Sequence, residues 1–168
     1  MPFLKSLIYG LVVGIAAYFI GESLPRRWFH ADRFPFRSRK WEKDGTVYRK
    51  LHVQNWKDHV PDMSRIMKNM VPKRLGVCPT SKQVRILVQE TCVAETVHTV
   101  LCLFAPPIWF FWRNVIGALL MSAYILGNLV FVIIQRYNRP ALISLAQRLE
   151  HREERKKNEN AAHTHPVG

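Results

Sequence analysis

Apolar residues of this chain gather in three long runs instead of being spread along it. The runs cover residues 7–21, 97–112 and 115–134, and the last contains twenty residues without a charge. A helix needs about 20 apolar residues to cross a hydrocarbon core of about 30 Å. The first two runs are shorter, so a tilted, kinked or re-entrant path stays open for them. The pattern predicts an all-α integral membrane protein with about three membrane-embedded helices.

Polar stretches divide this single membrane domain, residues 1–168, into four expected parts. They are an anchor helix, a basic cytoplasmic segment, a helical hairpin and a cytoplasmic tail, over residues 1–23, 24–95, 96–139 and 140–168. In the tail, apolar residues at helical spacing predict an amphipathic C-terminal helix that starts at Pro140. These residues are Leu142, Leu145, Ala146 and Leu149.

Two further elements are expected within the cytoplasmic segment. Residues 46–53 alternate loosely between apolar and polar, which predicts a short strand or an extended connection. Asp62 is a suitable N-cap for a following helix, in which Met63, Ile66, Met67 and Met70 have helical spacing. Such a stripe is more typical of packing than of a cofactor site.

The net charge of +13 indicates sidedness through its distribution. Residues 24–95 hold sixteen Lys and Arg against seven Asp and Glu, and residues 135–168 hold seven against four. The turn between the second and third runs carries only Arg113. Because cytoplasmic loops carry the excess of Lys and Arg, we expect a cell-membrane protein with the long segment and the tail in the cytoplasm. Cleavage of the first run as a signal peptide is the rival interpretation, and it conflicts with this rule.

Composition argues against nucleic-acid binding and against a disulfide framework. Aromatic and basic residues interleave over residues 25–43, but next to a membrane span this is typical of anchoring to membrane lipids at headgroup level. We therefore expect no nucleic-acid partner. Cys78, Cys92 and Cys102 are odd in number and lack metal-ligand spacing, which predicts free thiols.

The stretch QETCVAETVH places ionisable groups at the edge of the second apolar run. Thr80 or Ser81 is a suitable cap, and no helix breaker follows before Pro106, so one helix is expected to continue into the run. On a helical wheel, Glu95 and His98 lie on the stripe that faces the protein, where ionisable groups are costly and mark candidate functional sites. The alternative is a structural Glu95–His98 pair. The stripe consists of Val84, Leu87, Val88, Thr91, Glu95, His98 and Cys102.

The second polar motif, QRYNRP, follows the third run directly. Arg136 and Arg139 are three residues apart and are expected to converge, which suits a phosphate or a lipid headgroup because guanidinium forks match phosphate geometry. Ordinary snorkelling to the membrane surface is the alternative. Gln135, Tyr137 and Asn138 add more hydrogen-bonding capacity than anchoring needs, which favours a binding site.

Together the two motifs resemble those of the glycosyl-4,4'-diaponeurosporenoate acyltransferase family. ETCVAETVH lies before a kinked span and IIQRYNRPAL after the last one, and the likeness covers most of the chain. A looser match includes WKDHVPD, and it is better at Trp56, Lys57 and Asp62 than at His52 and His59. Carried over by motif, the site positions are Glu90, Glu95, His98, Gln135, Arg136, Tyr137, Asn138, Arg139 and Pro140.

The resemblance implies an enzyme that attaches a fatty acyl group to the sugar of a glycosylated carotenoid, the last step of staphyloxanthin-type pigment synthesis. His98 is then the expected general base, since imidazole titrates near neutral pH, and Glu95 or Glu90 would orient its ring. Arg136 and Arg139 would hold the phosphates of acyl-CoA, which is a donor substrate and not a resident cofactor. Direct attack by the acceptor is favoured, with Cys102 as the exception to test.

Two alternatives from other classes stay open. The first is a metal-dependent membrane enzyme in which Glu90, Glu95 and His98 combine with His52 or His59, although no recognised metal-ligand spacing such as HExxH occurs. The second is a non-catalytic scaffold or lipid-binding protein, in which the inward-facing ionisable residues are structural.

Overall fold

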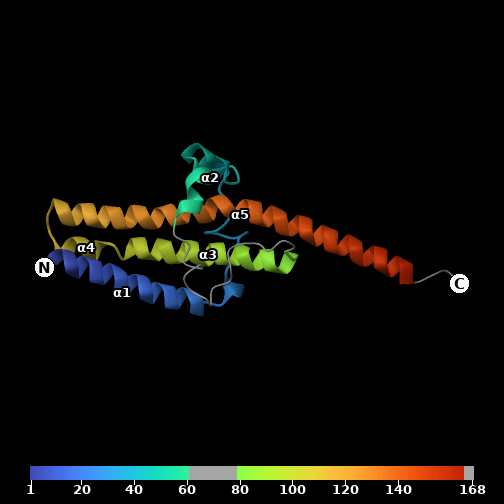
Figure 1. Ribbon diagram of the computed structural model, residues 1–168, viewed down its shortest axis with the longest axis horizontal. Coiled ribbons are helices and arrows are strands. Elements are labelled where there is room, and N and C mark those ends of the chain that lie inside the picture. The colour runs from blue at the N-terminus through green and yellow to red at the C-terminus, as the bar shows by residue number, and fades with distance from the viewer. Residues whose placement is uncertain (61–78, 165–168) are drawn as a thin grey trace.

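Three long helices form the body of the protein. The computed structural model describes residues 1–60 and 79–164, and this described part is helical and contains no strand. The long helices are α1 (Pro2–Ser23), α3 (Ser81–Leu103) and α5 (Val115–Thr164). In Figure 1, α3 lies between α1 and α5, and α5 extends well beyond both toward the C-terminus. The prediction of an all-α protein is confirmed.

Local sequence explains where α3 begins and ends. The Thr80 hydroxyl accepts a hydrogen bond from the Gln83 N–H, and the Gln83 side chain returns one to the Thr80 N–H, which forms a capping box. The helix then runs without a break to Leu103, as the sequence predicts. Pro106 starts the short helix α4 (Pro106–Phe111), after which a tight turn leads into α5.

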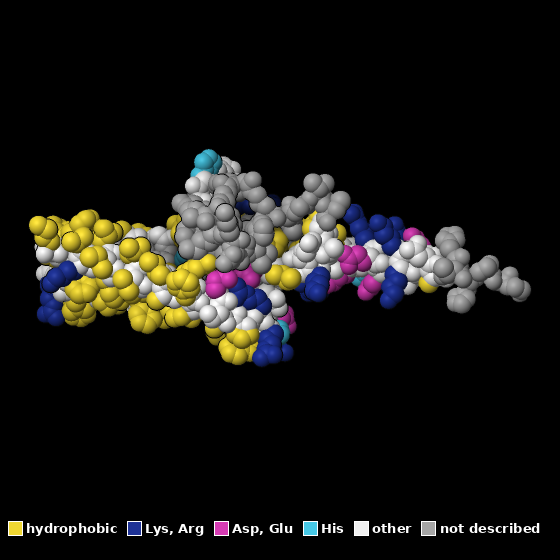
Figure 2. Space-filling view, turned by 60° about the horizontal axis from the view of Figure 1, so that its bottom comes forward, with side chains coloured by type: hydrophobic (Ala, Val, Ile, Leu, Met, Phe, Trp, Pro, Cys, Tyr) yellow, Lys and Arg dark blue, Asp and Glu magenta, His cyan; other side chains and the backbone are white. Residues whose placement is uncertain are grey.

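All three long helices are apolar and long enough to cross a membrane, with α4 continuing the second of them. Figure 2 shows that hydrophobic side chains cover one half of the molecule, whereas charged groups gather in the middle and along the far part of α5. Leu11, Phe19 and Leu119 each expose more than 60% of their surface. Such large exposed apolar surface suits contact with lipid.

The charged half is built on α3, α5 and the segment after α1. This segment forms short helical turns, η1 (Arg26–Trp28), η2 (Lys40–Glu42), η3 (Thr46–Leu51), α2 (Val53–Trp56) and η4 (Lys57–His59). The prediction of a strand or extended connection over residues 46–53 is therefore wrong. Tyr48 and Val53 are buried against Ile134 of α5, and this packing favours turns that present apolar side chains on one side.

α5 continues through Pro140, so the prediction of a separate amphipathic helix starting there is wrong. Proline lacks an N–H and deprives the carbonyl of Arg136, one turn earlier, of its usual helical donor. Gly45 packs on this point: a Cβ there would lie 3.3 Å from the Tyr137 carbonyl oxygen and 3.5 Å from that of Arg136. Its φ of +84° is a conformation that glycine tolerates best. Tertiary packing thus overrides the local tendency of proline to end a helix.

The helix expected after Asp62, with its methionine stripe, lies outside the described residues. Near the start of α3, the Ser81 hydroxyl donates to Glu153 over 2.6 Å, and Arg85 pairs with Glu150. These contacts join the start of α3 to α5.

Candidate active site

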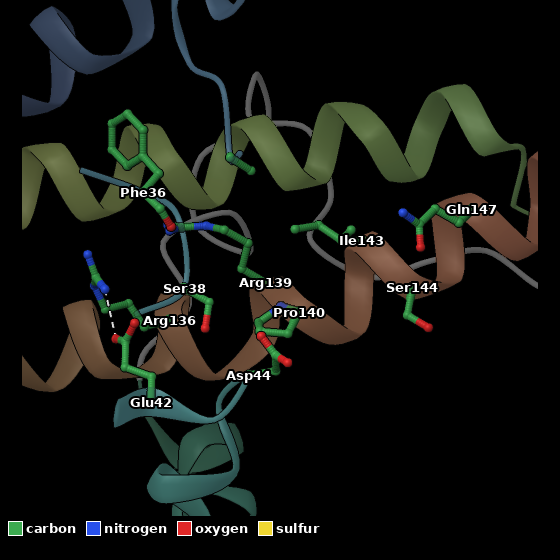
Figure 3. A pocket seen from close by; sticks show the side chains of 11 residues that line it. Phe36, Ser38, Glu42, Asp44, Arg136, Arg139, Pro140, Ile143, Ser144 and Gln147 are labelled. Atoms are coloured by element: carbon green, nitrogen blue, oxygen red, sulfur yellow. Dashed lines mark hydrogen bonds and ion pairs between the residues drawn. The ribbon is translucent and has the colours of Figure 1, made fainter. Parts of the chain in front are cut away.

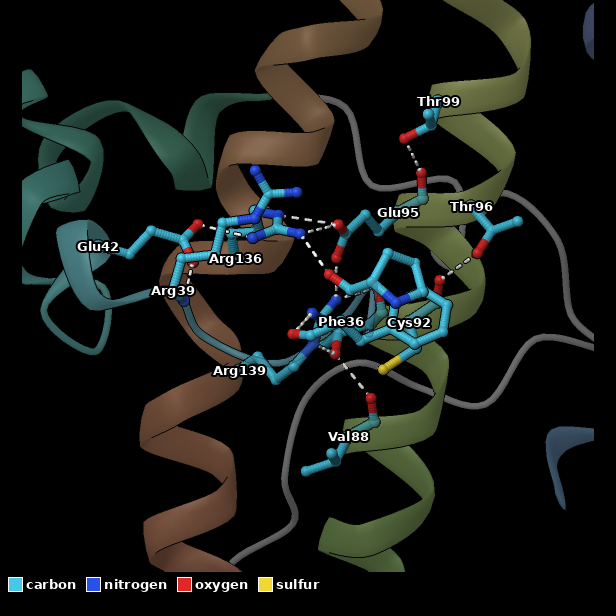
Figure 4. Close-up of polar contacts among 12 residues, drawn as sticks. Phe36, Arg39, Glu42, Val88, Cys92, Glu95, Thr96, Thr99, Arg136 and Arg139 are labelled. Atoms are coloured by element: carbon cyan, nitrogen blue, oxygen red, sulfur yellow. Dashed lines mark hydrogen bonds and ion pairs between the residues drawn. The ribbon is translucent and has the colours of Figure 1, made fainter. Parts of the chain in front are cut away.

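A network of ion pairs joins α3 to α5 where the apolar half meets the polar half. One oxygen of the Glu95 carboxylate accepts from Arg136 Nε over 2.8 Å, and the other accepts from Arg139 Nη2 over 2.5 Å. Glu95 and Arg139 are buried, with 5% and 3% of their surfaces exposed. Figure 4 shows both guanidinium groups directed at the carboxylate from the facing helix. The predicted convergence of the two arginines is confirmed.

Glu42, from the segment after α1, completes the network. Its carboxylate accepts from Arg136 Nη1 over 2.7 Å, from the Arg39 backbone N–H over 2.6 Å and from the Tyr48 hydroxyl. Burial alone would raise the pKa of the Glu42 carboxyl, but these hydrogen bonds together hold that pKa below its ordinary value. Burial and the same carboxylate raise the pKa of Tyr48. Glu42 is therefore an ionised anchor for the segment.

The two arginines also hold backbone carbonyls of this segment. Arg136 Nη2 donates to the Pro35 carbonyl and Arg139 Nη1 to the Phe36 carbonyl, each over 2.8 Å. Arg139 Nε donates to the Thr91 hydroxyl, again over 2.8 Å. The guanidinium groups thus spend their donors on the protein, and two carboxylates balance their charge. This arrangement favours a positioning role for the arginines over the phosphate clamp expected from the sequence.

His98 lies one turn beyond Glu95, toward the apolar half. Its Nδ1 is 2.9 Å from Asn128 Oδ1, and its ring stacks on Phe131 with centroids 4.5 Å apart. The Asn128 amide nitrogen donates to the Tyr124 carbonyl, which leaves Oδ1 to accept from His98. Nδ1 therefore donates this hydrogen bond, and Nε2 is the nitrogen that can accept a proton when the ring is neutral.

Asn128 thus takes the orienting place that the sequence suggested for Glu95 or Glu90. Both Glu95 oxygens are bound by arginines, and Glu90 accepts from Arg26 Nε over 2.7 Å. Arg26 also donates to the Gly21 and Glu22 carbonyls at the end of α1. The Arg26–Glu90 pair therefore ties the end of α1 to α3. The catalytic role of His98 stays a prediction.

The remaining predicted residues lie where the looser match, WKDHVPD, meets the QRYNRP motif. Lys57 Nζ donates to Asn138 Oδ1 over 3.2 Å and lies 5.5 Å from the centre of the Tyr137 ring. The Trp56 indole donates to the Leu51 carbonyl and packs on the Tyr48 cluster. Gln135 is buried beside α3 and, with Asn138, borders a cavity of about 60 Å³. The structure thus brings Trp56 and Lys57 next to the QRYNRP motif.

A larger cavity of about 350 Å³ lies on the polar side of the network. Figure 3 shows Phe36 beside α3, whereas Glu42 and Asp44 lie next to α5, with Glu42 paired to Arg136. Two carboxylates on the wall repel a phosphate. The arginines on the wall are already paired with carboxylates, so they do not offset this repulsion. The α5 side of the wall consists of Arg136, Arg139, Pro140, Ile143, Ser144 and Gln147.

The ligand set of the metal-enzyme alternative is dispersed in the part of the chain that the structure describes. Among those residues, no three His, Cys, Asp or Glu side chains come close enough to hold a metal ion. His52 and His59 are exposed on the small turns, whereas Glu90 and Glu95 point to arginines. Cys92 and Cys102 are free thiols, as predicted, and Cys78 lies outside the described residues.

Comparison with known proteins identifies the family. The model of the glycosyl-4,4'-diaponeurosporenoate acyltransferase family matches residues 25–148. The chain belongs to this acyltransferase family. A relative of that name from Staphylococcus aureus strain bovine RF122 / ET3-1 is 27% identical over 151 residues, which cover 88% of this chain and 90% of the relative. The relatives from strains MRSA252 and USA300 are 27% and 26% identical over the same lengths. No solved structure matches.

This acyltransferase contains functional candidates that the sequence reasoning missed. Asn128 was not among the predicted residues, because it carries no charge and lies within an otherwise apolar run. A single amide inside an apolar span is nevertheless a signal, since it needs a hydrogen-bond partner there. Glu42 had no comparable signal, because its partner Arg136 is 94 residues away.

Proposed function

We propose that this protein transfers a fatty acyl group from acyl-CoA to a sugar hydroxyl of a membrane glycolipid, with a glycosylated carotenoid as the leading acceptor. Family membership supports acyl transfer, and the name of the relatives supports a glycosylated acceptor. The observation that carries the mechanism is His98, whose basic nitrogen is fixed by Asn128 and Phe131 at the edge of the apolar half.

In the proposed reaction, His98 Nε2 accepts the proton of the acceptor hydroxyl while that oxygen attacks the thioester carbonyl carbon. The tetrahedral intermediate collapses with cleavage of the carbon–sulfur bond, and the imidazolium returns the proton to the departing thiolate. The products are the sugar ester and free CoA. Positioned bases of this kind contribute about 10²–10⁴-fold in rate. Cys102 contacts the Ile125 carbonyl, and a Cys102→Ser enzyme with normal turnover would exclude an acyl-enzyme on that residue.

The polar half supplies binding for the donor in this proposal. Arg136 and Arg139 position the segment after α1, and that segment exposes cations to solvent. Phosphates of acyl-CoA would meet these cations, while the thioester reaches the level of His98. This placement requires the polar half to face the cytoplasm, as the charge distribution predicts. The exposed cations are Arg27, Arg33, Arg37, Arg39, Lys40, Lys43, Arg49 and Lys50.

The experiment is transfer by the purified protein in lipid nanodiscs. Labelled acyl-CoA is supplied with a glycosylated carotenoid, and in parallel with a simple alkyl glycoside, and products are followed by mass spectrometry together with release of CoA. We expect an acceptor heavier by one acyl unit and an equal amount of CoA. Absence of transfer with every donor and acceptor, from protein that still stabilises a partner enzyme, would support the scaffold alternative instead.

A further inference from the structure

An apolar cavity of about 410 Å³ lies between α1, α4 and α5, in the apolar half. Leu7, Gly10 and Leu11 contribute one wall, Ile108 the second, and α5 the third. The Ser6 hydroxyl on this wall already donates to the Pro2 carbonyl over 3.2 Å. The cavity is thus lined almost completely by hydrocarbon.

The cavity and His98, which belongs to α3, contact the same face of α5. Leu120 and Tyr124 line it, and Asn128 and Phe131 contact His98; the spacings of four, four and three residues place all of them on one side of the helix. From Asn128 to Leu120 the helix rises about 12 Å. The cavity therefore lies within the reach of a fatty acyl chain whose carbonyl is at His98.

The lining and the size of the cavity suit a hydrocarbon occupant. At about 30 Å³ for a group the size of a water molecule, the cavity has room for roughly a dozen chain carbons. Gly10 faces Tyr124, and a Cβ at Gly10 would lie 3.4 Å from the Tyr124 ring, so a larger side chain would have to occupy the cavity.

We propose that this cavity binds the fatty acyl chain of the donor and that Gly10 sets the depth to which the chain can enter. The proposal rests on the proposed function, because that function supplies the acyl group at His98. It assigns chain-length preference to α1, which contributes no residue to the His98–Asn128 pair.

Gly10→Leu tests the proposal, and Gly14→Leu is its matched control. Both place leucine on the same helix, one turn apart, but a Cβ at Gly14 meets no atom within 4 Å. A series of saturated acyl-CoA donors of increasing length is assayed with each protein. In Gly10→Leu we expect kcat/KM for the longest donors to fall by about tenfold or more relative to the shortest, as expected when a few methylene groups are excluded from an apolar pocket. Gly14→Leu should keep the wild-type profile.

A second measurement separates failure of the cavity from failure of the function. An acyl-CoA with a photoreactive group at the chain terminus is cross-linked to the wild type and both variants, and the labelled peptides are mapped. Label in α1 near Gly10 and in α5 near Leu120, weakened in Gly10→Leu but not in Gly14→Leu, supports the proposal even if no transfer occurs. Active protein with identical chain-length profiles in both variants overturns it. An altered KM for the glycolipid acceptor in Gly10→Leu, with an unaltered donor profile, would assign the cavity to the acceptor and overturn it as well.

Discussion

The network around Glu95 and the pair of His98 with Asn128 occupy neighbouring turns of the same two helices, yet they are built differently. In the network, two buried carboxylates pair with the buried Arg139 and the partly buried Arg136, and backbone carbonyls take the spare guanidinium donors. His98 is an imidazole whose direction is fixed through Nδ1 and through the Phe131 face. The difference indicates that the network holds the helices and the segment after α1 in place, whereas His98 is the residue proposed for the chemistry.

His98→Gln should have the largest effect on activity. Glutamine can still donate to Asn128, but it lacks a basic nitrogen, so kcat should fall by about 10²–10⁴-fold while the thermal unfolding temperature in micelles stays near that of the wild type. The measurement is acyl transfer at saturating acyl-CoA. Near-normal turnover would remove His98 from the chemistry and would leave the two regions equally structural.

Glu95→Gln should act mainly on stability. The amide keeps the shape of the side chain, but it leaves two buried arginines with one counter-ion fewer, at a cost of about 3–5 kcal/mol in the free energy of unfolding. The measurement is denaturation in detergent followed by circular dichroism. Glu159→Gln is the control, because its pair with Arg155 is exposed and should change the same free energy by less than about 1 kcal/mol.

The opposite outcome would return Glu95 to the chemistry. If Glu95→Gln unfolds like the wild type but transfers acyl groups poorly, the carboxylate acts on His98 as the sequence suggested. The comparison of the two regions then fails, because one residue would belong to both.

Asn128→Leu should have an intermediate effect on activity. The substitution removes the acceptor for the His98 Nδ1 hydrogen and frees the ring to adopt the other tautomer. Loss of an orienting partner costs metal-bound histidines about 10–100-fold, and we expect a similar loss in kcat here. Positioning, as distinct from packing, is tested by the pH profile of kcat, whose acidic limb should shift in Asn128→Leu. Asn128→Asp should instead retain an acceptor and recover part of the activity.

Sequence patterns predicted the elements that depend on local rules. The capping box at Thr80 and the 3.6-residue period of the inward stripe gave the start and the buried face of α3, including Val84, Leu87 and Glu95. The continuous course of α5 through Pro140 was not predicted, because long-range contacts hold the helix on both sides of that proline, through Arg136 and Arg139 before it and Glu150 after it. The role of Glu42 was not predicted either, because its partner Arg136 is 94 residues away. The motif likeness identified which residues come together, but not which of them pair.

The smallest expected effect is the change of stability with pH that comes from the contacts of the segment after α1. Because the folded pKa of Glu42 lies below its ordinary value of 4.5, its ionised form stabilises the fold above that pH, and this contribution is lost as the pH falls from there toward the folded pKa. Tyr48 has the opposite sign: its raised pKa contributes stability below its ordinary value of 10.0, and the contribution is lost as the pH rises beyond it. From these two groups, the free energy of unfolding of the wild type should therefore not change with pH between these limits and should decrease outside them. Glu42→Gln should lower the plateau and flatten the acidic limb, and Tyr48→Phe should flatten the alkaline limb and weaken the acidic one, because the Tyr48 hydrogen bond helps to lower the Glu42 pKa. If the acidic limb is the same in Glu42→Gln as in the wild type, another carboxyl group holds the segment after α1. The ion-pair network would then not be what attaches this segment.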